Sequence, residues 1–148
     1  MGGIVGYVPG VYDLFHVGHL NVLRQAKQHC DVLIAGVVAD DVVARTKGFR
    51  PVIPLTERLE IVRAIDIVDR VYAERTTDKL DSWEHLHFDR IFKGDDWRGT
   101  EKGRHLEARL HAVGVEVVYF PYTLNTSSTQ LRRALTRRVA ARAPVAAT

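Results

Sequence analysis

Short apolar runs recur along the chain, each separated from the next by a stretch in which apolar residues follow helical spacing. The apolar runs cover residues 4–8, 31–38, 68–72, 89–93 and 115–120. They are nearly continuous, as expected of strands buried on both faces of a parallel sheet. Helical spacing covers residues 20–26, 56–64, 78–87 and 101–112. This alternation predicts an α/β fold with a doubly wound parallel five-stranded sheet in a single domain.

Local signals refine the boundaries between these elements. Asp40 opens a short helical piece, and residues 45–51 then form a mobile basic loop that ends at a proline. Thr56 is expected to be the N-cap of the next helix, because a threonine hydroxyl can accept an early backbone N–H. Gly114 is expected to end the helix over residues 101–112. The last helix is expected to begin at residues 127–128.

The least ordinary stretches all follow a predicted strand, at residues 10–19, 40–50, 94–97 and 122–129. In doubly wound sheets, ligands bind beyond the carboxyl ends of the strands, near the point where the strand order reverses. These positions therefore predict one binding site along the carboxyl edge of the sheet.

Composition narrows the class of protein. The chain has 148 residues, of which 46% are hydrophobic and 26% charged, as in ordinary globular domains. We expect the domain to span residues 1–138, followed by a disordered, Ala-rich tail at 139–148. The single cysteine suits the cytoplasm, and neither a membrane-spanning run nor a signal peptide is expected. The net charge of +3 suits anionic substrates, and the arginines near the end indicate a solvated helix rather than nucleic-acid binding.

The stretch over residues 10–19 joins the first strand to the first helix. Backbone N–H groups at a helix start are unpaired and favour anions, so this place can bind phosphate. Gly10 and Gly18 let a ligand approach the backbone, and His16 and His19 are spaced so that both rings face it. The same two histidines could instead be zinc ligands, although Cys30 has no partner motif, or could lie on a helix face without a role.

This stretch resembles the signature of the nucleotidylyltransferases, in which His-x-Gly-His follows a Gly-x-Tyr-Asp turn. The chain is most similar to the small bacterial cytidylyltransferases of the glycerol-3-phosphate type, from about Ile4 to Leu135. The resemblance implies the Rossmann-like fold of that superfamily and transfer of CMP from CTP to a small phosphorylated or phosphonylated acceptor, with release of pyrophosphate. It also implies that His16, His19 and Lys47 are catalytic, that magnesium bridges oxygens of the triphosphate, and that the chain forms a homodimer.

Two further motifs extend the resemblance. Residues 94–97 read Gly-Asp-Asp-Trp, as in the cytidylyltransferases, and the hydroxyl residues at 126–129 resemble the element that holds the β- and γ-phosphates in that family. Each has an ordinary alternative, a capped turn with Trp97 as a core residue and a simple N-cap respectively. The resemblance implies few protein ligands to the magnesium, none of which is assigned to a residue, and acceptor contacts from Asp13 and Asp40. The nucleotide-binding residues that it implies are Gly10, Val11, Tyr12, His16, His19, Lys47, Asp95, Trp97, Thr123, Ser127, Ser128 and Thr129.

The chain also departs from this pattern. Many relatives carry arginine at the positions of Asp66 and Tyr122, and arginine makes bidentate phosphate contacts. Another arginine, from among Arg63, Arg98 and Arg132, could replace them in space. Residues 47–54 are similar to the heptose-1-phosphate adenylyltransferases, so one alternative is the same chemistry with ATP. A second alternative is a nucleotide-binding regulatory module without turnover.

Overall fold

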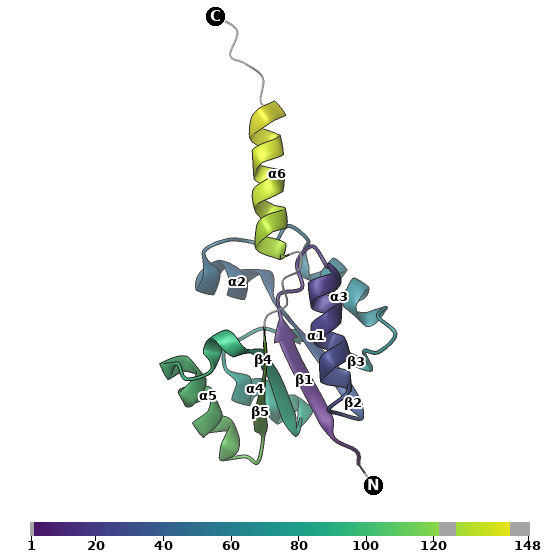
Figure 1. Ribbon diagram of the computed structural model, residues 1–148, viewed down its shortest axis with the longest axis vertical. Coiled ribbons are helices and arrows are strands. Elements are labelled where there is room, and N and C mark those ends of the chain that lie inside the picture. Colours follow the sequence, from purple (N-terminus) through teal and green to yellow (C-terminus); the bar gives the residue numbers. More distant parts are fainter. Residues whose placement is uncertain (1, 122–126, 143–148) are drawn as a thin grey trace, which may run out of the picture.

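The computed structural model describes residues 2–121 and 127–142. Its described residues form a sheet of five parallel strands in the order β3-β2-β1-β4-β5 (Figure 1). The strands are β1 (Val5–Gly10), β2 (Val32–Val38), β3 (Arg70–Glu74), β4 (Arg90–Gly94) and β5 (Glu116–Phe120). The strand order reverses between β1 and β4, so the carboxyl ends of these two strands form the crevice where this architecture binds ligands.

Helices cover both faces of the sheet. One face packs against α1 (Val17–Lys27) and α3 (Leu55–Arg63), and the other against α4 (Lys79–Leu86) and α5 (Glu101–His111). The carboxyl edge carries α2 (Asp40–Lys47), the short helix η1 (Asp95–Trp97) and the start of α6 (Ser128–Arg142). The doubly wound α/β fold predicted from the apolar pattern is therefore confirmed.

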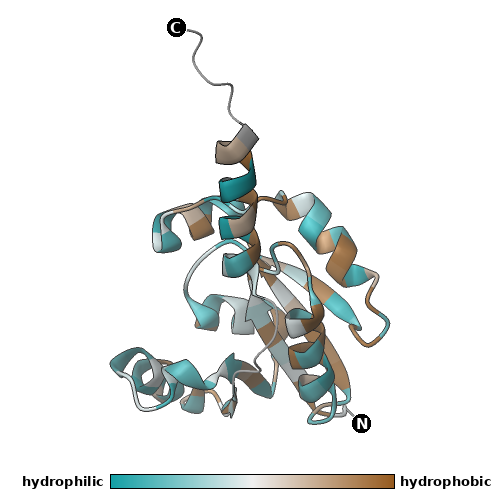
Figure 2. Cartoon of the chain, turned by 45° about the horizontal axis from the view of Figure 1, so that its top comes forward, coloured by the Kyte–Doolittle hydropathy of each residue, from teal (hydrophilic) through white to brown (hydrophobic). Residues whose placement is uncertain are grey.

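Each strand contributes alternately to two apolar clusters, as the two-residue period of a strand requires. On β1, Val8 packs with Leu23 of α1, whereas Tyr7 packs with Leu110 of α5. Hydrophobic residues, brown in Figure 2, accordingly lie mainly on the central strands. Full burial of one such side chain stabilises the fold by about 1.5–3 kcal/mol. The two clusters together hold the strands so that their carboxyl ends stay in register.

A buried polar network lies within the second cluster. Tyr7 donates a 2.5 Å hydrogen bond to Glu74, and Lys79 pairs with the other oxygen of the same carboxylate. A side chain at Gly36 would collide with the Tyr7 hydroxyl, 2.0 Å from an ideal Cβ, so glycine is required there. This network joins the end of β3 to the start of α4, close to the carboxyl edge.

Several predicted boundaries differ from the structure. Strand β3 begins at Arg70 rather than at residue 68, because Val68 donates to Ile65 in a turn. Helix α3 begins at Leu55 with Pro54 at its N-cap, so Thr56 lies inside the helix. Helix α5 ends with Ala112 as its C-cap, and Gly114 adopts its positive φ of 81° two residues later.

Another difference concerns the predicted basic loop over residues 45–51. Its first part, including Lys47, is instead the last turn of α2, which closes at Gly48 with a φ of 77°. Thr46 continues the helix by donating to the Val42 carbonyl at 2.8 Å. Lys47 is thus held by a helix and not by a mobile loop.

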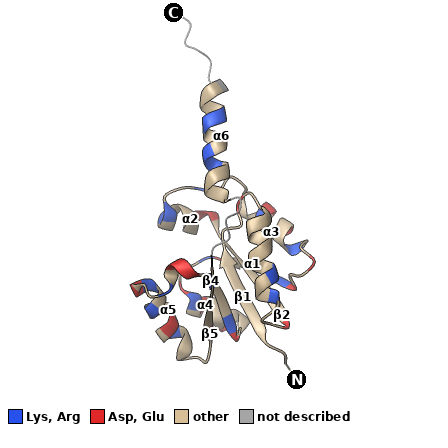
Figure 3. Ribbon diagram, viewed as in Figure 1, with Lys and Arg blue, Asp and Glu red and all other residues tan. Residues whose placement is uncertain are grey.

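Helix α6 leaves the body of the domain and projects from it (Figure 1). It runs to Arg142, beyond residue 138 where the sequence places the end of the domain, and residues 143–148 lie outside the described residues. Lys and Arg residues, blue in Figure 3, recur along this helix. Within the described ranges, no helix is both long and apolar enough to span a membrane.

Candidate functional site

The turn after β1 has an uncommon backbone. Tyr12 and Leu14 have φ values of 56° and 52°, a region that side chains other than glycine seldom adopt. The Tyr12 hydroxyl donates to the Val8 carbonyl at 2.9 Å, which holds the first of these residues in place. Strain of this kind persists only where the surroundings impose it, and it concentrates at functional sites.

Asp13 lies between these two residues and is completely buried. Its carboxylate accepts hydrogen bonds from the backbone N–H groups of Val52 and Ile53, both at 2.9 Å. Arg132 of α6 approaches the same carboxylate at 3.4 Å. Asp13 therefore fastens the turn to a second loop and to α6, and its predicted contact with an acceptor stays a prediction.

Arg58 braces the same region from α3. This side chain is fully buried and donates to the Val11 and Val38 carbonyls at 2.6 and 2.8 Å and to the Ile53 carbonyl at 2.8 Å. Its remaining nitrogen pairs with Asp40 at 2.6 Å. Asp40, another predicted acceptor residue, is thus engaged in positioning the loops after β1 and β2, and its acceptor contact also stays a prediction.

His16 and His19 cap the start of α1. His16 is the N-cap residue, and its Nδ1 accepts the Gly18 N–H at 3.0 Å. The Nδ1 of His19 accepts the His16 N–H at 3.2 Å, which completes a reciprocal capping box made of two histidines. The two rings lie 4.0 Å apart between centroids. Since both Nδ1 atoms accept N–H groups, each neutral ring carries its proton on Nε2.

Ser128, the first residue of α6, fixes where these Nε2 atoms point. Its hydroxyl donates to the Asp13 carbonyl at 2.5 Å and lies 3.3 Å from Nε2 of His16 and 3.5 Å from Nε2 of His19. Because the only proton of Ser128 is used by Asp13, its oxygen is left to accept from the two rings. The pair therefore presents two N–H donors side by side.

Burial keeps both histidines neutral. It lowers the pKa of His16, and it lowers the pKa of His19 to about 4, with the neighbouring His16 adding to the effect. At pH 7 both rings are therefore donors at Nε2 without a net charge. Zinc would need further ligands, and within the described residues no group of three or more His, Cys, Asp and Glu side chains could hold a metal ion.

A pocket of about 390 Å³ opens in front of the histidines. It is lined by parts of β1, α1, the end of α2, β4, β5 and α6. The predicted residues that line it are Gly10, Val11, Tyr12, His16, His19, Lys47, Ser127, Ser128 and Thr129. The structure thus brings together residues from opposite ends of the chain at the carboxyl edge of the sheet.

Other predicted residues lie elsewhere. Asp95 is exposed and does not line this pocket, and Trp97 packs on the other face of the sheet, against the cluster that contains Leu106. Thr123 lies outside the described residues, as does Tyr122. Asp66 is exposed in the turn before β3, at the amino edge of the sheet and remote from the pocket.

Three cations surround the pocket. Arg132 stacks on Phe49 at 4.1 Å and donates to Thr129 at 3.2 Å, and of the three arginines considered as replacements it is the one that lines the pocket. Desolvation and the charge of Arg132 lower the pKa of Lys47. Burial, together with the nearby Lys79, lowers the pKa of Lys93 to about 8. Such mutual repulsion favours occupation of the pocket by an anion.

Lys93 was not predicted as a site residue. It lies one residue before the end of β4, beside the reversal point, and its ammonium lies 4.1 Å from the centre of the Trp97 ring. The available signal was its position, since a lysine at the carboxyl end of a central strand points to the ligand crevice. Among the described lining residues no carboxylate is present, so the donor set does not fit a magnesium ion held by the protein.

The chain matches one protein family and several named relatives. The model of the cytidylyltransferase-like family matches residues 7–134. The chain is 34% identical to the FAD synthase of Thermococcus kodakarensis over 89% of each chain. It is 33% identical to the bifunctional protein HldE of Hyphomonas neptunium over 86% of its own length, and 39% identical to the ethanolamine-phosphate cytidylyltransferase of Arabidopsis thaliana over 61%. It spans only 26% and 22% of these two longer proteins.

A solved structure shares the fold. The lipopolysaccharide core biosynthesis protein of Thermoplasma volcanium superposes with a TM-score of 0.71 at 26% identity, over 84% of this chain and all of that one. The doubly wound fold described above is therefore shared with a solved protein.

Proposed function

Because the chain belongs to the cytidylyltransferase-like family of nucleotidyltransferases, we propose that it transfers CMP from CTP to a small phosphorylated acceptor. An oxygen of the acceptor phosphate forms a bond to the α-phosphorus of CTP. The bond from that phosphorus to the bridging oxygen breaks, and pyrophosphate leaves with the bonding electrons. The attacking oxygen is already anionic, so the reaction needs positioning and charge stabilisation more than a strong base.

The observation that carries this proposal is the neutral histidine pair with both Nε2–H groups beside a cationic pocket. Two such donors stabilise negative charge on the triphosphate as it moves toward the leaving pyrophosphate. Neutral rings suit this role, since they donate without forming a permanent ion pair that would bind substrate and transition state equally. Asp13 and Ser128 act as positioning residues that hold the rings and the turn.

We assign the β- and γ-phosphates to the part of the pocket between the start of α6 and the end of α2. There the first residues of α6 present hydroxyl and N–H groups, and Lys47 and Arg132 supply positive charge. Magnesium would enter with the triphosphate, because no carboxylate is among the described lining residues. The transfer of the nucleotidyl group needs no protein ligand to that ion.

Cytosine is favoured over adenine by the Gly-Asp-Asp-Trp sequence at residues 94–97 and by the relative named as an ethanolamine-phosphate cytidylyltransferase. Adenylyl transfer from ATP is the second candidate, because the relatives that the chain matches over most of their length are named FAD synthase. The exposed Asp95 and the position of Trp97 outside the histidine pocket leave the choice of base to experiment.

Pyrophosphate release tests the proposal. The protein is incubated with magnesium, each of the four NTPs, and acceptors such as glycerol 3-phosphate, ethanolamine phosphate and flavin mononucleotide. We expect release with CTP that depends on an acceptor. Faster release with ATP would favour the second candidate. Nucleotide binding in a thermal-shift assay, without release from any pair, would contradict catalysis and support a regulatory module.

A further inference from the structure

A buried carboxylate lies at the carboxyl edge of the sheet and takes no part in the site described above. Glu74, the last residue of β3, is 1% exposed and does not line the histidine pocket. A buried charge destabilises a fold unless the fold supplies partners for it, and such groups concentrate near functional sites. Neither the family nor the proposed transfer reaction gives Glu74 a role.

The sheet is arranged around this carboxylate. Tyr7 of β1 reaches across β2 to donate to Glu74 at 2.5 Å, and only glycine at position 36 leaves room for the phenol oxygen. Burial and the charge of Glu74 raise the pKa of Tyr7 well above its usual value, so the phenol stays a donor. Lys79 pairs with the other carboxylate oxygen. The carboxylate is therefore fixed from two sides.

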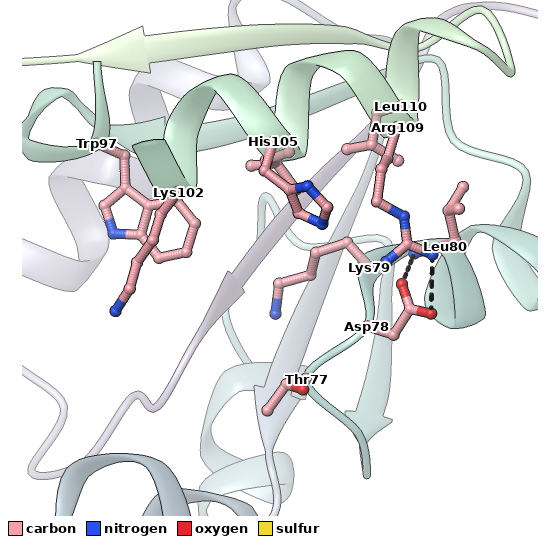
Figure 4. A pocket seen from close by; sticks show the side chains of 10 residues that line it. Thr77, Asp78, Lys79, Leu80, Trp97, Lys102, His105, Arg109 and Leu110 are labelled. Carbon is pink, nitrogen blue, oxygen red and sulfur yellow. Dashed lines mark hydrogen bonds and ion pairs between the residues drawn. The ribbon is translucent and has the colours of Figure 1, made fainter. Parts of the chain in front are cut away.

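The carboxylate in turn holds Lys79 in place. Figure 4 shows Lys79 extending from the start of α4 into a cavity of about 170 Å³ between α4 and α5. A lysine side chain is flexible, but the ion pair with Glu74 restricts its ammonium to one position. The side chain is only 14% exposed, so water screens this charge weakly. One positive and one negative charge thus have defined positions on this face of the sheet.

Lys93 of β4 lies on the same face and at the same edge as this ion pair. Glu74 and Lys93 each lie two residues after a strand residue of the second apolar cluster, Tyr72 and Ile91 respectively. Strand residues two apart share a face, so both side chains lie on the side that α4 and α5 cover. Lys93 also lines the histidine pocket. It therefore connects the buried ion pair with the place where an anionic substrate would bind.

Four charged groups from four elements face Lys93 within the described residues. Burial and two lysines, Lys79 of α4 and Lys47 of α2, lower its pKa to about 8, against the opposite effect of Glu74 of β3 and Asp96 of η1. Asp96 is exposed, so water screens its charge, whereas Glu74 is buried. Glu74 is thus the carboxylate with the stronger effect on Lys93.

We propose that Glu74 is a positioning residue for the reaction, whose carboxylate balances Lys79 and stabilises the ammonium of Lys93, which binds a phosphate group of the substrate. The inference rests on the proposed function, which supplies the anionic substrate, and it concerns how the pocket keeps its positive charge. Glu74 acts through Lys93 and does not touch the substrate. Tyr7 and Gly36 serve the same end, because they supply the hydrogen bond and the space that hold the carboxylate.

Inorganic pyrophosphate without magnesium is the probe, so that only cations of the protein bind the anion. Its Kd is measured by calorimetry from about pH 6.5 to 9.5, on either side of the Lys93 pKa of about 8. The probe's own titration is the same in every experiment and cancels when variants are compared. We expect binding to weaken about tenfold as Lys93 loses its proton. Lys93→Gln should abolish this transition.

Glu74→Gln and Lys79→Gln remove the two ends of one ion pair. The first removes a charge that favours protonated Lys93, so the midpoint of the transition should fall by about one pH unit. The second removes a charge that opposes it, so the midpoint should rise by about the same amount. A purely structural effect of breaking the pair would be the same in both variants. Glu116→Gln, which breaks a pair with Arg90 at the amino edge, is the control and should leave the midpoint unchanged.

Thermal unfolding shows whether each variant folds. If Glu74→Gln does not fold, Lys79→Gln decides the test through its upward shift. An unchanged or lowered midpoint in Lys79→Gln would overturn the inference, as would an unchanged or raised midpoint in folded Glu74→Gln. A transition that persists in Lys93→Gln, or absence of pyrophosphate binding to the unaltered protein, would overturn it too. Because this binding needs no nucleotide or acceptor, its outcome is separate from the release assay that tests the proposed function.

Discussion

At the scale of the residue, His16 and His19 use their two ring nitrogens for different purposes. Each Nδ1 accepts a backbone N–H at the start of α1, and each Nε2 faces Ser128 and the pocket. A substitution that removes the whole ring therefore removes an N-cap contact and a donor together. Capping contacts of this kind contribute about 0.5–2 kcal/mol, and a catalytic donor about 2.7–4 kcal/mol.

His16→Asn separates the two contributions. Asparagine is a strong N-cap residue, so its side-chain oxygen can replace Nδ1, but it offers no donor at the position of Nε2. We expect turnover to fall by about 10²–10³-fold while the melting temperature stays near that of the unaltered protein. Pyrophosphate release and thermal unfolding measure the two quantities.

His16→Ala is the companion variant. It should lose as much turnover as His16→Asn and should also unfold at a lower temperature, because the Gly18 N–H loses its acceptor. If His16→Asn retained near-normal turnover, the assignment of His16 as a catalytic donor would be wrong. Release of bound zinc from either variant would instead revive the interpretation of the pair as metal ligands.

The lowered pKa of His19 makes stability depend on pH. The pKa is about 4 in the folded chain and 6.5 for an unperturbed histidine, so between these values the unfolded chain binds more protons. The contribution of neutral His19 to the free energy of unfolding is therefore complete above about pH 6.5, and it is lost as the pH falls toward 4. His19→Gln, which can keep the capping contact, should show a smaller fall in melting temperature over this range. The same fall in both proteins would contradict the assignment.

At the scale of the element, the buried carboxylate of Asp13 joins the first turn to the loop before α3. Asp13→Asn replaces one acceptor oxygen with a donor that faces a backbone N–H, so a buried hydrogen bond is lost. We expect a loss of about 1–3 kcal/mol in the free energy of unfolding, measured with urea. Asp41→Asn is the control, since its pair with Arg45 is exposed and long at 3.9 Å, and should change stability by less than about 0.5 kcal/mol.

The elements themselves follow closely from the sequence, because apolar spacing reports burial. All five predicted strands occur, and the start of α1 at the histidine motif is where the turn and glycines place it. Boundaries that depend on tertiary contacts could not be read in this way. Lys47 lies on α2 rather than in a loop because the helix closes only at Gly48.

Individual site residues were less predictable than elements. Motifs in the sequence mark the histidines and the hydroxyl residues of α6, which the pocket brings together. They do not mark Lys93, whose role comes from the strand neighbours of β4, or Arg58, whose four partners come from distant parts of the chain. The sequence pattern around each of these two residues is that of an ordinary strand or helix. Contacts that depend on strand order cannot be derived from local spacing.

At the scale of the whole molecule, the homodimer stays a prediction. The formal net charge is +3, and α6 carries five arginines without an acidic residue, which leaves a net charge of −2 on the rest of the chain. Light scattering should give about twice the chain mass of 16.7 kDa at working concentration. A mass equal to that of one chain would reject the dimer. A dimer that depends on this charge asymmetry would also dissociate more readily at high salt.

Ser128 has one further consequence for the molecule as a whole. It is the first residue of the helix that projects from the domain, and its hydroxyl contacts the Asp13 carbonyl and lies beside both histidine rings. The first residue of α6 thus contacts the donor pair, whereas the rest of the helix projects from the domain. Any change in the direction of α6 would therefore move the Ser128 oxygen relative to both Nε2 atoms, so the donor pair is tied to the position of a helix that lies mostly outside the domain body.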